Sequence, residues 1–190
     1  MKISRKLGLF TLLLAVAIPV GAWASFKPIR ILAPELNGVI CLDAVCVEEP
    51  AQLQRVQKLQ QEAIEQVAIK LVPLNEAPLT VFCSTRACYQ SFGGGMERGA
   101  TLFNLGVILP PESWVPHIVE HEYIHMLQSQ ELGLLGRQRT PDWFKEGMPF
   151  LISAPPAHDL PDYAKPLAAE YQAWELRVGR KNVWQAIDKP

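Results

Sequence analysis

The sequence predicts an α+β fold with a small mixed or antiparallel sheet, a long helix, and further helices towards the C-terminus. Two observations lead to this prediction. Short apolar runs bounded by proline and glycine, which are typical of strands, occur before residue 110. Apolar residues at helical spacing dominate the chain after residue 113. A length of 190 residues with 49% hydrophobic side chains suffices for one domain with its own core.

The first 24 residues have the pattern of an export signal. Three basic residues within the first six are followed by an apolar run over 7–20 and by Ala22-Trp23-Ala24, an A-x-A cleavage site. The apolar stretch is long enough to serve instead as an uncleaved anchor, the one route to membrane association that the sequence offers. We expect cleavage, and we expect residues 25–190 to form a single domain in the periplasm or outside the cell.

The charge balance argues against a nucleic-acid partner. Without the first 24 residues, 15 basic and 19 acidic side chains remain, a net charge of −4 with no basic block. The run Gly93-Gly94-Gly95 is a flexible turn rather than a phosphate-binding loop, because no Gly-Lys-Ser or Gly-Lys-Thr follows it.

In the first half of the chain, proline and glycine separate short segments. Asn37-Gly38 is a turn signal, and Pro50 follows two glutamates as a favoured first residue of a helix. That helix is amphipathic, and its glutamine-rich outer face is either a solvated surface or a partner-binding face. The expected elements are a strand over 26–33, a short strand or hairpin over 39–47, a helix over 50–71, a strand over 79–84, a short helix turn over 85–92 and a strand over 100–109.

The second half of the chain is expected to be helical. One helix begins near Ser113, tolerates Pro116 in its first turn, continues to about Glu131 and ends at Gly133. The remaining elements are a loop over 134–140, a helix that begins at Asp142 and contains Glu146, a break at Ala154-Pro155-Pro156, a helix over 163–178 and a short helix over 182–187.

Four cysteines occur as two close pairs, each with four residues between its members. In an exported chain, an even number of cysteines is typical of disulfides. Three connectivities are open, and we favour Cys41–Cys46 with Cys83–Cys88 because each closes a short local loop. A four-cysteine zinc site is the alternative, which an oxidising compartment disfavours.

The motif H-E-x-x-H occurs at His121-Glu122-Tyr123-Ile124-His125, inside the long predicted helix. Residues four apart lie on one helix face, so both imidazoles can reach one metal ion while Glu122 contacts a water beside it. His117 extends the stripe, but at about 1.5 Å per residue it would lie roughly 12 Å from His125 along the axis. We therefore expect His117 at the surface or beside the ligands. In the alternative reading, the histidines are ordinary helix residues without a metal.

A third ligand is expected from the segment Thr140-Pro141-Asp142-Trp143-Phe144-Lys145-Glu146-Gly147-Met148. With Asp142 as the helix cap, Glu146 falls in the early turns of the next helix. H-E-x-x-H followed about twenty residues later by W-F-x-E-G resembles the gluzincin metallopeptidases, the thermolysin-like zinc enzymes, and especially their small secreted bacterial members. The resemblance is concentrated in residues 100–155.

The resemblance implies a zinc-dependent peptidase with a minimal zincin-like fold. His121, His125 and Glu146 would hold one Zn²⁺ per chain, with imidazole ligands about 2.0–2.1 Å from the ion. The ion would bring the pKa of its bound water to about 7, and Glu122 would take the proton and later pass it to the leaving amine. Nitrogen and oxygen ligands with an open position suit Zn²⁺ without excluding other divalent metals. The expected substrate is a peptide or protein.

Two further roles follow from the resemblance. In gluzincins, an edge strand near the active-site helix binds the substrate backbone, and the expected strand here is Ala100–Leu109. The expected substrate-binding residues are Leu105, Gly106 and Val107. An interior strand without a substrate role is the alternative. A tyrosine or histidine from a later element commonly stabilises the oxyanion, and the candidates are Tyr163, then His158, with Tyr171 as a third.

Two positions depart from the gluzincin pattern. The family usually continues Glu-Gly-x-Ala, whereas Pro149 follows Met148 here. Proline inside a helix costs about 3 kcal/mol, so the Glu146 helix should be short, kinked or irregular. Phe150 stands where thermolysin-like enzymes often place an acid that orients a zinc-binding histidine. These departures motivate an alternative function, a non-catalytic envelope protein that keeps the scaffold for binding. The chain is also short for this family, so either its cleft is shallow or a partner subunit completes it.

Overall fold

The computed structural model describes residues 11, 15, 19 and 21–187 of the chain. The expected export signal, residues 1–24, lies largely outside the described residues. Within the described part, no helix combines the length and the hydropathy that a membrane span requires.

The strands form one mixed sheet, which confirms the predicted α+β fold. They are β1 Ile40–Leu42, β2 Val45–Val47, β3 Thr80–Phe82, β4 Ala100–Leu102 and β5 Gly106–Leu109. Their order across the sheet is β1-β2-β3-β5-β4. β2, β3 and β5 are parallel, while β1 and β4 run antiparallel to their neighbours β2 and β5. β4 is therefore one of the two edges of the sheet, and β5 is interior.

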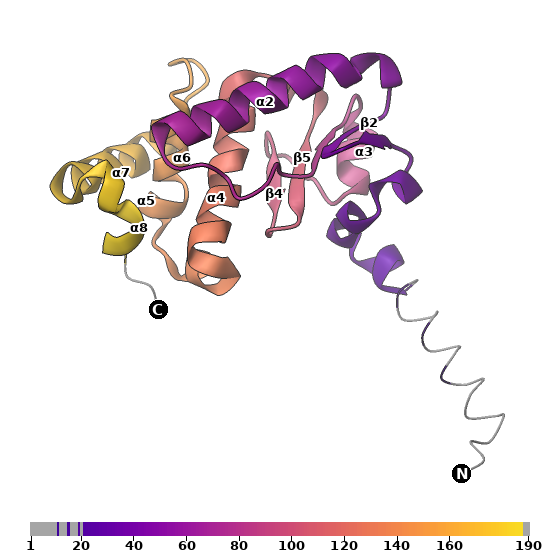
Figure 1. Cartoon of the computed structure of the whole chain (residues 1–190), viewed down its shortest axis with the longest axis horizontal. Helices are drawn as coiled ribbons and strands as arrows, with labels where there is room; N and C mark the ends of the chain where they lie inside the picture. The colour runs from indigo at the N-terminus through magenta and orange to yellow at the C-terminus, as the bar shows by residue number, and fades with distance from the viewer. Residues whose placement is uncertain (1–10, 12–14, 16–18, 20, 188–190) are drawn as a thin grey trace, which may run out of the picture.

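Alternate strand residues face two separate cores. On one face, Phe82, Val107 and Leu109 pack with the helices α2 (Leu53–Lys70) and α4 (Pro116–Arg139). On the other face, Val81 and Ile108 pack with residues of α3 (Arg86–Ser91) and of the N-terminal segment. Figure 1 shows α2 lying across α4 and extending over the sheet.

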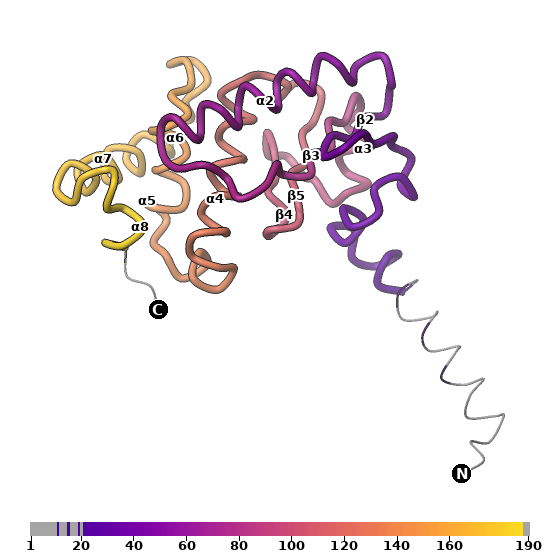
Figure 2. The backbone as a smooth tube through the Cα atoms, in the orientation of Figure 1, coloured from indigo at the N-terminus to yellow at the C-terminus, as the bar shows by residue number. Residues whose placement is uncertain are grey.

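The predicted helix over 50–71 is confirmed as α2 preceded by a 3₁₀ turn, Pro50–Gln52. One of its glutamines, Gln60, faces inward, and its Nε2 donates to Pro78 O at 2.9 Å. After Leu71 the chain returns alongside α2 to β3, as the tube in Figure 2 shows. The Gln60 hydrogen bond therefore ties this returning segment to the helix.

The C-terminal helices cover the remaining side of α4. They are α5 Asp142–Lys145, α6 Gly147–Ser153, α7 Ala164–Val178 and α8 Val183–Ala186. α7 packs against both α5 and α6, at the yellow end of the molecule in Figure 1. Phe144 is central to this packing, because its ring lies 5.9 Å from Tyr171 and 5.7 Å from Trp174. The predicted helices near 163–178 and 182–187 are thus confirmed.

The strand predicted over 26–33 is wrong. This segment forms a 3₁₀ helix, Lys27–Leu32, and a second one, Pro34–Asn37, follows it. A proline stands in the first turn of each, where its missing N–H is tolerated but where a sheet ladder would lose a hydrogen bond. Arg30 holds the segment against α3, because its Nη1 donates to Ser91 O at 2.7 Å.

The single strand predicted over 100–109 is instead a hairpin. Phe103 adopts a left-handed backbone (φ 57°), and Leu105 N donates to Leu102 O at 3.0 Å, so the chain reverses between β4 and β5. Gly106 allows a close approach to the next strand, since a Cβ there would lie 2.5 Å from Leu79 O. On this side of the sheet, the edge is therefore formed by residues 100–102 and not by residues 106–109.

The loop predicted over 134–140 is also wrong in its main part. α4 is interrupted at Gly133 (φ 72°, ψ 164°), close to the predicted helix end, but helical structure resumes and continues to Arg139. Glycine suits this backbone because it has no Cβ to clash in the left-handed region. The break changes the direction of the chain and brings Arg137 to the cleft described below.

A buried ion pair joins α2 to α4 next to the histidine motif. Lys70 Nζ lies 2.7 Å from Glu120 Oε1 and donates to Ile152 O at 3.2 Å. Glu120 is 4% exposed. Burial raises the pKa of Glu120, and the hydrogen bond from Lys70 opposes that effect.

Lys70→Met should lower the free energy of unfolding by about 3 kcal/mol at neutral pH, because it leaves the Glu120 carboxyl buried and unpaired. Urea denaturation measures this loss. Lys58→Met is the matched control: it removes an exposed pair with Glu62 at 3.7 Å and should cost less than about 1 kcal/mol. Equal losses in the two variants would contradict a stabilising role for the buried pair.

Candidate metal centre

The two histidines of the motif and Glu146 converge on one point. His121 and His125 lie one turn apart on α4, with ring centroids 4.9 Å apart. Glu146 follows α5 and precedes α6, and its Oε2 lies 3.9 Å from His121 Nε2 and 3.5 Å from His125 Nε2. The three ligand atoms all lie within 4.8 Å of one another.

This donor set fits a single divalent ion. Ligands about 2.0–2.1 Å from a tetrahedral zinc lie about 3.3 Å from each other, slightly closer than the two measured separations. Two imidazole nitrogens and one carboxylate oxygen also form the ligand set of catalytic zinc sites that keep one position open. The His121, His125 and Glu146 group could therefore hold a metal ion, and the ligand types leave its identity open.

Glu146 owes its position to the break between α5 and α6. The irregularity predicted from Pro149 is confirmed, because one helix ends at Lys145 and the next begins at Gly147. Pro149 consequently falls in the first turn of α6, where its missing N–H is tolerated. Gly147 packs directly on α7: a Cβ there would lie 2.2 Å from Leu167 O, so a larger residue would displace the backbone beside Glu146.

The Gln128 side chain joins the two ligand-bearing segments. Its Nε2 donates to Phe144 O at 2.9 Å and to Lys145 O at 3.1 Å. The Lys145 carbonyl is the one to which residue 149 would donate in a continuous helix, so Gln128 supplies the donor that Pro149 lacks. Gln128 Oε1 lies 3.1 Å from His125 Nδ1, which assigns the proton of neutral His125 to Nδ1 and leaves Nε2 for a metal.

The environment sets the protonation states that a metal site requires. Phe150 packs on His121, with ring centroids 4.5 Å apart, and the pocket buries the imidazole. Burial, together with the charge of His125, lowers the pKa of His121 to about 3. Burial raises the pKa of Glu146, but the interactions with His125 and His121 outweigh it and lower the pKa to about 2. At neutral pH, His121 is therefore neutral and Glu146 is ionised, as metal binding demands.

Glu122 lies beside the ligands and is held by the edge strand. The Thr101 hydroxyl on β4 is 2.8 Å from Glu122 Oε2 and 2.9 Å from the backbone O of Glu122. Gly99 leaves room for the carboxyl, since a Cβ there would lie 2.8 Å from Glu122 Oε1. Burial raises the pKa of Glu122, while His125 and Thr101 act in the opposite direction. A raised pKa makes a carboxylate a stronger proton acceptor than an ordinary glutamate, which suits a general base.

These side chains line a cleft of about 510 Å³ whose other walls come from residues 96–101 and 153–163. Asp159 links the two walls, because its Oδ1 lies 3.2 Å from Arg98 Nη1 and its Oδ2 lies 3.1 Å from His117 Nε2. His117 thus lines the cleft beside the ligands but does not belong to the metal group, in agreement with the prediction from helix geometry.

The three candidates for oxyanion stabilisation are in different environments. Tyr163 lines the cleft, with its ring 6.0 Å from that of Phe150. The His158 side chain is 81% exposed and lies outside the cleft. Tyr171 is buried against Phe144 in the C-terminal aromatic packing, also outside the cleft. Geometry therefore favours Tyr163 over the other two.

The residues predicted to bind substrate do not line the metal cleft. Leu105 lies in the hairpin turn, while Gly106 and Val107 are buried on β5, which has a partner strand on each side. The hairpin residues that do line the cleft are Ala100 and Thr101 on β4. The prediction treated residues 100–109 as one strand, because an unbroken apolar run carries no mark of the reversal at Phe103.

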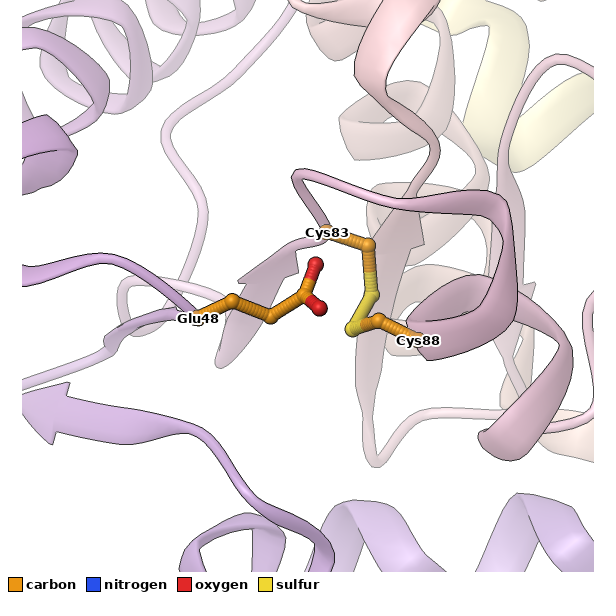
Figure 3. Close-up of side chains that lie close together, drawn as sticks. All are labelled: Glu48, Cys83 and Cys88. Atoms are coloured by element: carbon orange, nitrogen blue, oxygen red, sulfur yellow. A yellow bond between two sulfur atoms is a disulfide. The ribbon is translucent and has the colours of Figure 1, made fainter.

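Both predicted disulfides are present, Cys41–Cys46 and Cys83–Cys88. Glu48 lies close to the second one, and Figure 3 shows its carboxylate directed toward the two sulfurs. Because both sulfurs are bonded to each other, this cluster offers no thiolate ligands. Glu48 instead accepts from Thr85 N at 2.8 Å and from Thr85 Oγ1 at 2.9 Å, at the start of α3. Disulfides of this kind are typical of an oxidising, extracytoplasmic compartment.

No protein-family model, curated protein or solved structure matches this chain. The assignment of the site therefore rests on the geometry of its own residues.

The sequence motifs indicate His121, Glu122, His125 and Glu146 but not three residues beside them, Gln128, Thr101 and Arg137. Gln128 could have been found, since residues three apart on a helix are neighbours and an amide can orient an imidazole. No sequence pattern indicates Thr101 or Arg137, because their positions in the cleft depend on the backbone turns at Phe103 and Gly133.

The stability of the metal-free protein should fall as the pH falls, because His121 and Glu146 have pKa values below their ordinary ones. The unfolded chain takes up protons from about pH 6.5 downward at the histidine and from about pH 4.5 downward at the carboxyl, while the folded chain does not. Between pH 7 and pH 5, His121→Asn should reduce the loss by about 2 kcal/mol in urea unfolding with chelator. His158→Asn, an exposed control, should keep the full loss, and an unchanged loss in His121→Asn would contradict the burial of a neutral imidazole.

Gln128→Met should weaken zinc binding about 10- to 100-fold, because it removes the acceptor that orients His125 and the donor that holds the carbonyl before Glu146. Competition with a chromophoric chelator measures the dissociation constant. The exposed Gln66→Met on α2 serves as the control. An affinity equal to that of the wild type would show that the His125 orientation does not depend on Gln128.

Proposed function

We propose that this chain is a zinc-dependent peptidase of the gluzincin type that acts in the cell envelope. The observation that carries the proposal is the convergence of His121, His125 and Glu146 at one point with the buried Glu122 carboxyl beside it, all open to a cleft. A site that only stored a metal would have no use for a second carboxyl that is not one of its three ligands. The two local disulfides and the export pattern of residues 1–24 support an envelope location.

Bound at this site, a zinc ion would polarise the carbonyl of a peptide bond and activate a water molecule. Glu122 would accept a proton from that water as the water oxygen bonds to the carbonyl carbon. As the C–N bond breaks, Glu122 returns the proton to the leaving amine, so that water is added across the bond.

The Thr101 hydroxyl fits Glu122 in both protonation states. When the carboxyl is ionised, Thr101 donates to Oε2 at 2.8 Å. When the carboxyl is protonated, it donates to Thr101 Oγ1, whose own proton turns to the backbone O of Glu122 at 2.9 Å. Both states keep a hydrogen bond between the Thr101 hydroxyl and the Glu122 carboxyl, which favours repeated proton transfer.

Two other features of the cleft suit a peptide substrate. β4 is an edge strand, so its outer backbone groups can pair with an extended peptide beside Glu122. The Tyr163 hydroxyl is the candidate donor to the oxyanion, since the ring lines the cleft close to Phe150.

The alternative of a non-catalytic binding protein was motivated by Pro149 and Phe150. The proline does not argue for it in the folded chain, because the new helix at Gly147 accommodates it. Phe150 packs on His121, while Gln128 orients the other histidine, His125. We therefore place the peptidase first.

Metal content and digestion of a peptide library, in the wild type and in Glu122→Gln, test the proposal. We expect about one zinc per chain in both proteins, and a fall of about 10²- to 10⁴-fold in cleavage rate in the variant. Glu131→Gln, on the same helix but outside the cleft, should cleave at the wild-type rate.

Each other outcome is decisive. Cleavage retained by Glu122→Gln would refute the assigned base. Zinc without any cleavage by the wild type would favour the binding protein, and the absence of zinc would refute both functions.

A further inference from the structure

Arg137 reaches the metal cleft from an unexpected direction. It lies beyond the break at Gly133, on the segment that sequence analysis predicts as a loop. Its side chain lines the cleft together with Thr101, and the same two residues also line a second hollow of about 410 Å³. Arg137 and Thr101 therefore lie where the two hollows meet.

The Arg137 guanidinium has no protein partner in the part of the chain that the structure describes. Its Nε is buried without a hydrogen bond, and no carboxylate forms an ion pair with it. The other cations bordering these hollows are paired, since Arg98 lies 3.2 Å from Asp159 and Lys145 lies 2.8 Å from Asp142. A buried donor without an acceptor is costly unless a ligand supplies one.

The charges around the metal position leave Arg137 free for an anion. Burial lowers the pKa of the Arg137 guanidinium. Glu146 and Glu122 act in the opposite direction, so both carboxylates lie near enough to interact with the guanidinium. A divalent ion between the histidines and Glu146 would balance both carboxylates. One positive charge, that of Arg137, then remains in excess beside the reacting position.

The second hollow has a wall suited to an apolar side chain. Leu102, Phe103 and Leu134 line it, and the residues Phe103 and Leu134 are 40% and 38% exposed. The hollow opens beside Arg137, so one residue of a ligand could place a carboxylate on the guanidinium and an apolar side chain against this wall.

We propose that Arg137 binds a carboxylate of the peptide substrate, namely that of an apolar C-terminal residue whose side chain enters the second hollow. This rests on the proposed peptidase function and makes the enzyme a carboxypeptidase: the bond that breaks releases the last residue, which carries the carboxylate. An acidic side chain just after the scissile bond offers the same chemistry from another source. Arg137 is on this view a residue that selects the substrate, while Glu122 performs the proton transfer.

The test compares two peptides ending in leucine, one with a free carboxylate and one with a carboxamide. In the wild type we expect kcat/KM about 10- to 100-fold higher for the free acid, the range of one charge-assisted hydrogen-bonded pair. Arg137→Gln should abolish this preference with zinc content unchanged. Arg137→Lys should retain part of it, because lysine keeps the charge but not the forked donors. Arg139→Gln, an exposed neighbour, should retain all of it.

A third peptide identifies the source of the carboxylate. It ends in a carboxamide and carries glutamate, or glutamine as its control, after the scissile bond. Loss of a glutamate preference in Arg137→Gln would support the carboxylate contact but assign it to a side chain. Equal loss for charged and neutral peptides, or no acid preference in the wild type, would overturn the proposal.

Binding separates this inference from the peptidase proposal. Calorimetry of the zinc-loaded Glu122→Gln protein with the same two leucine peptides requires no turnover. An acid preference in binding that disappears in the Glu122→Gln, Arg137→Gln double variant would support the Arg137 contact even if no cleavage were found. Cleavage of both peptides with equal binding would uphold the peptidase and refute the role of Arg137.

Discussion

The hydrogen bonds of the Gln128 amide fix the two segments of the candidate metal site relative to each other. The α4 helix supplies two imidazoles by its own periodicity, but the third ligand comes from a separate segment that must be fixed relative to α4. Gln128 does this with both ends of one side chain, since its nitrogen binds the carbonyls of Phe144 and Lys145 and its oxygen meets His125 Nδ1. Because Glu146 follows Lys145 directly, these contacts orient two of the three ligands at once.

The break between α5 and α6 is the other half of this arrangement. Pro149 prevents a continuous helix, and the carbonyl that it leaves without a donor becomes the acceptor for Gln128. On the opposite side, Gly147 packs closely on the backbone of Leu167, so the junction between α5 and α6 lies directly against α7. The aromatic packing of Phe144 with Tyr171 and Trp174 fixes the same segment in the core. The C-terminal helices therefore contribute to the metal site without supplying any ligand themselves.

The cleft combines opposite polarities in a small space. Burial keeps His121 neutral and raises the pKa of Glu122, while Glu146 is held ionised by the neighbouring imidazoles. Thr101 on the sheet edge contacts the Glu122 carboxyl, and Arg137, which has no ion-pair partner among the described residues, adds a cation to the cleft lining. A divalent cation bound by His121, His125 and Glu146 would balance the charges of the two carboxylates in this partly buried site.

The sequence by itself determined the features that depend on local spacing. The four-residue interval of the histidines, the short loops between the paired cysteines, the amphipathic pattern of α2 and the helix-breaking effect of Pro149 all act within a few residues, and the structure agrees with each. Tertiary structure decided everything that depends on a change of chain direction. The apolar run over 100–109 has the same sequence pattern whether it forms one strand or a hairpin. Only the left-handed turn at Phe103 makes β4 an edge strand and β5 an interior strand. Likewise, the position of Arg137 follows from the backbone at Gly133, because residues far apart along the chain meet only through such turns and through the packing that stabilises them.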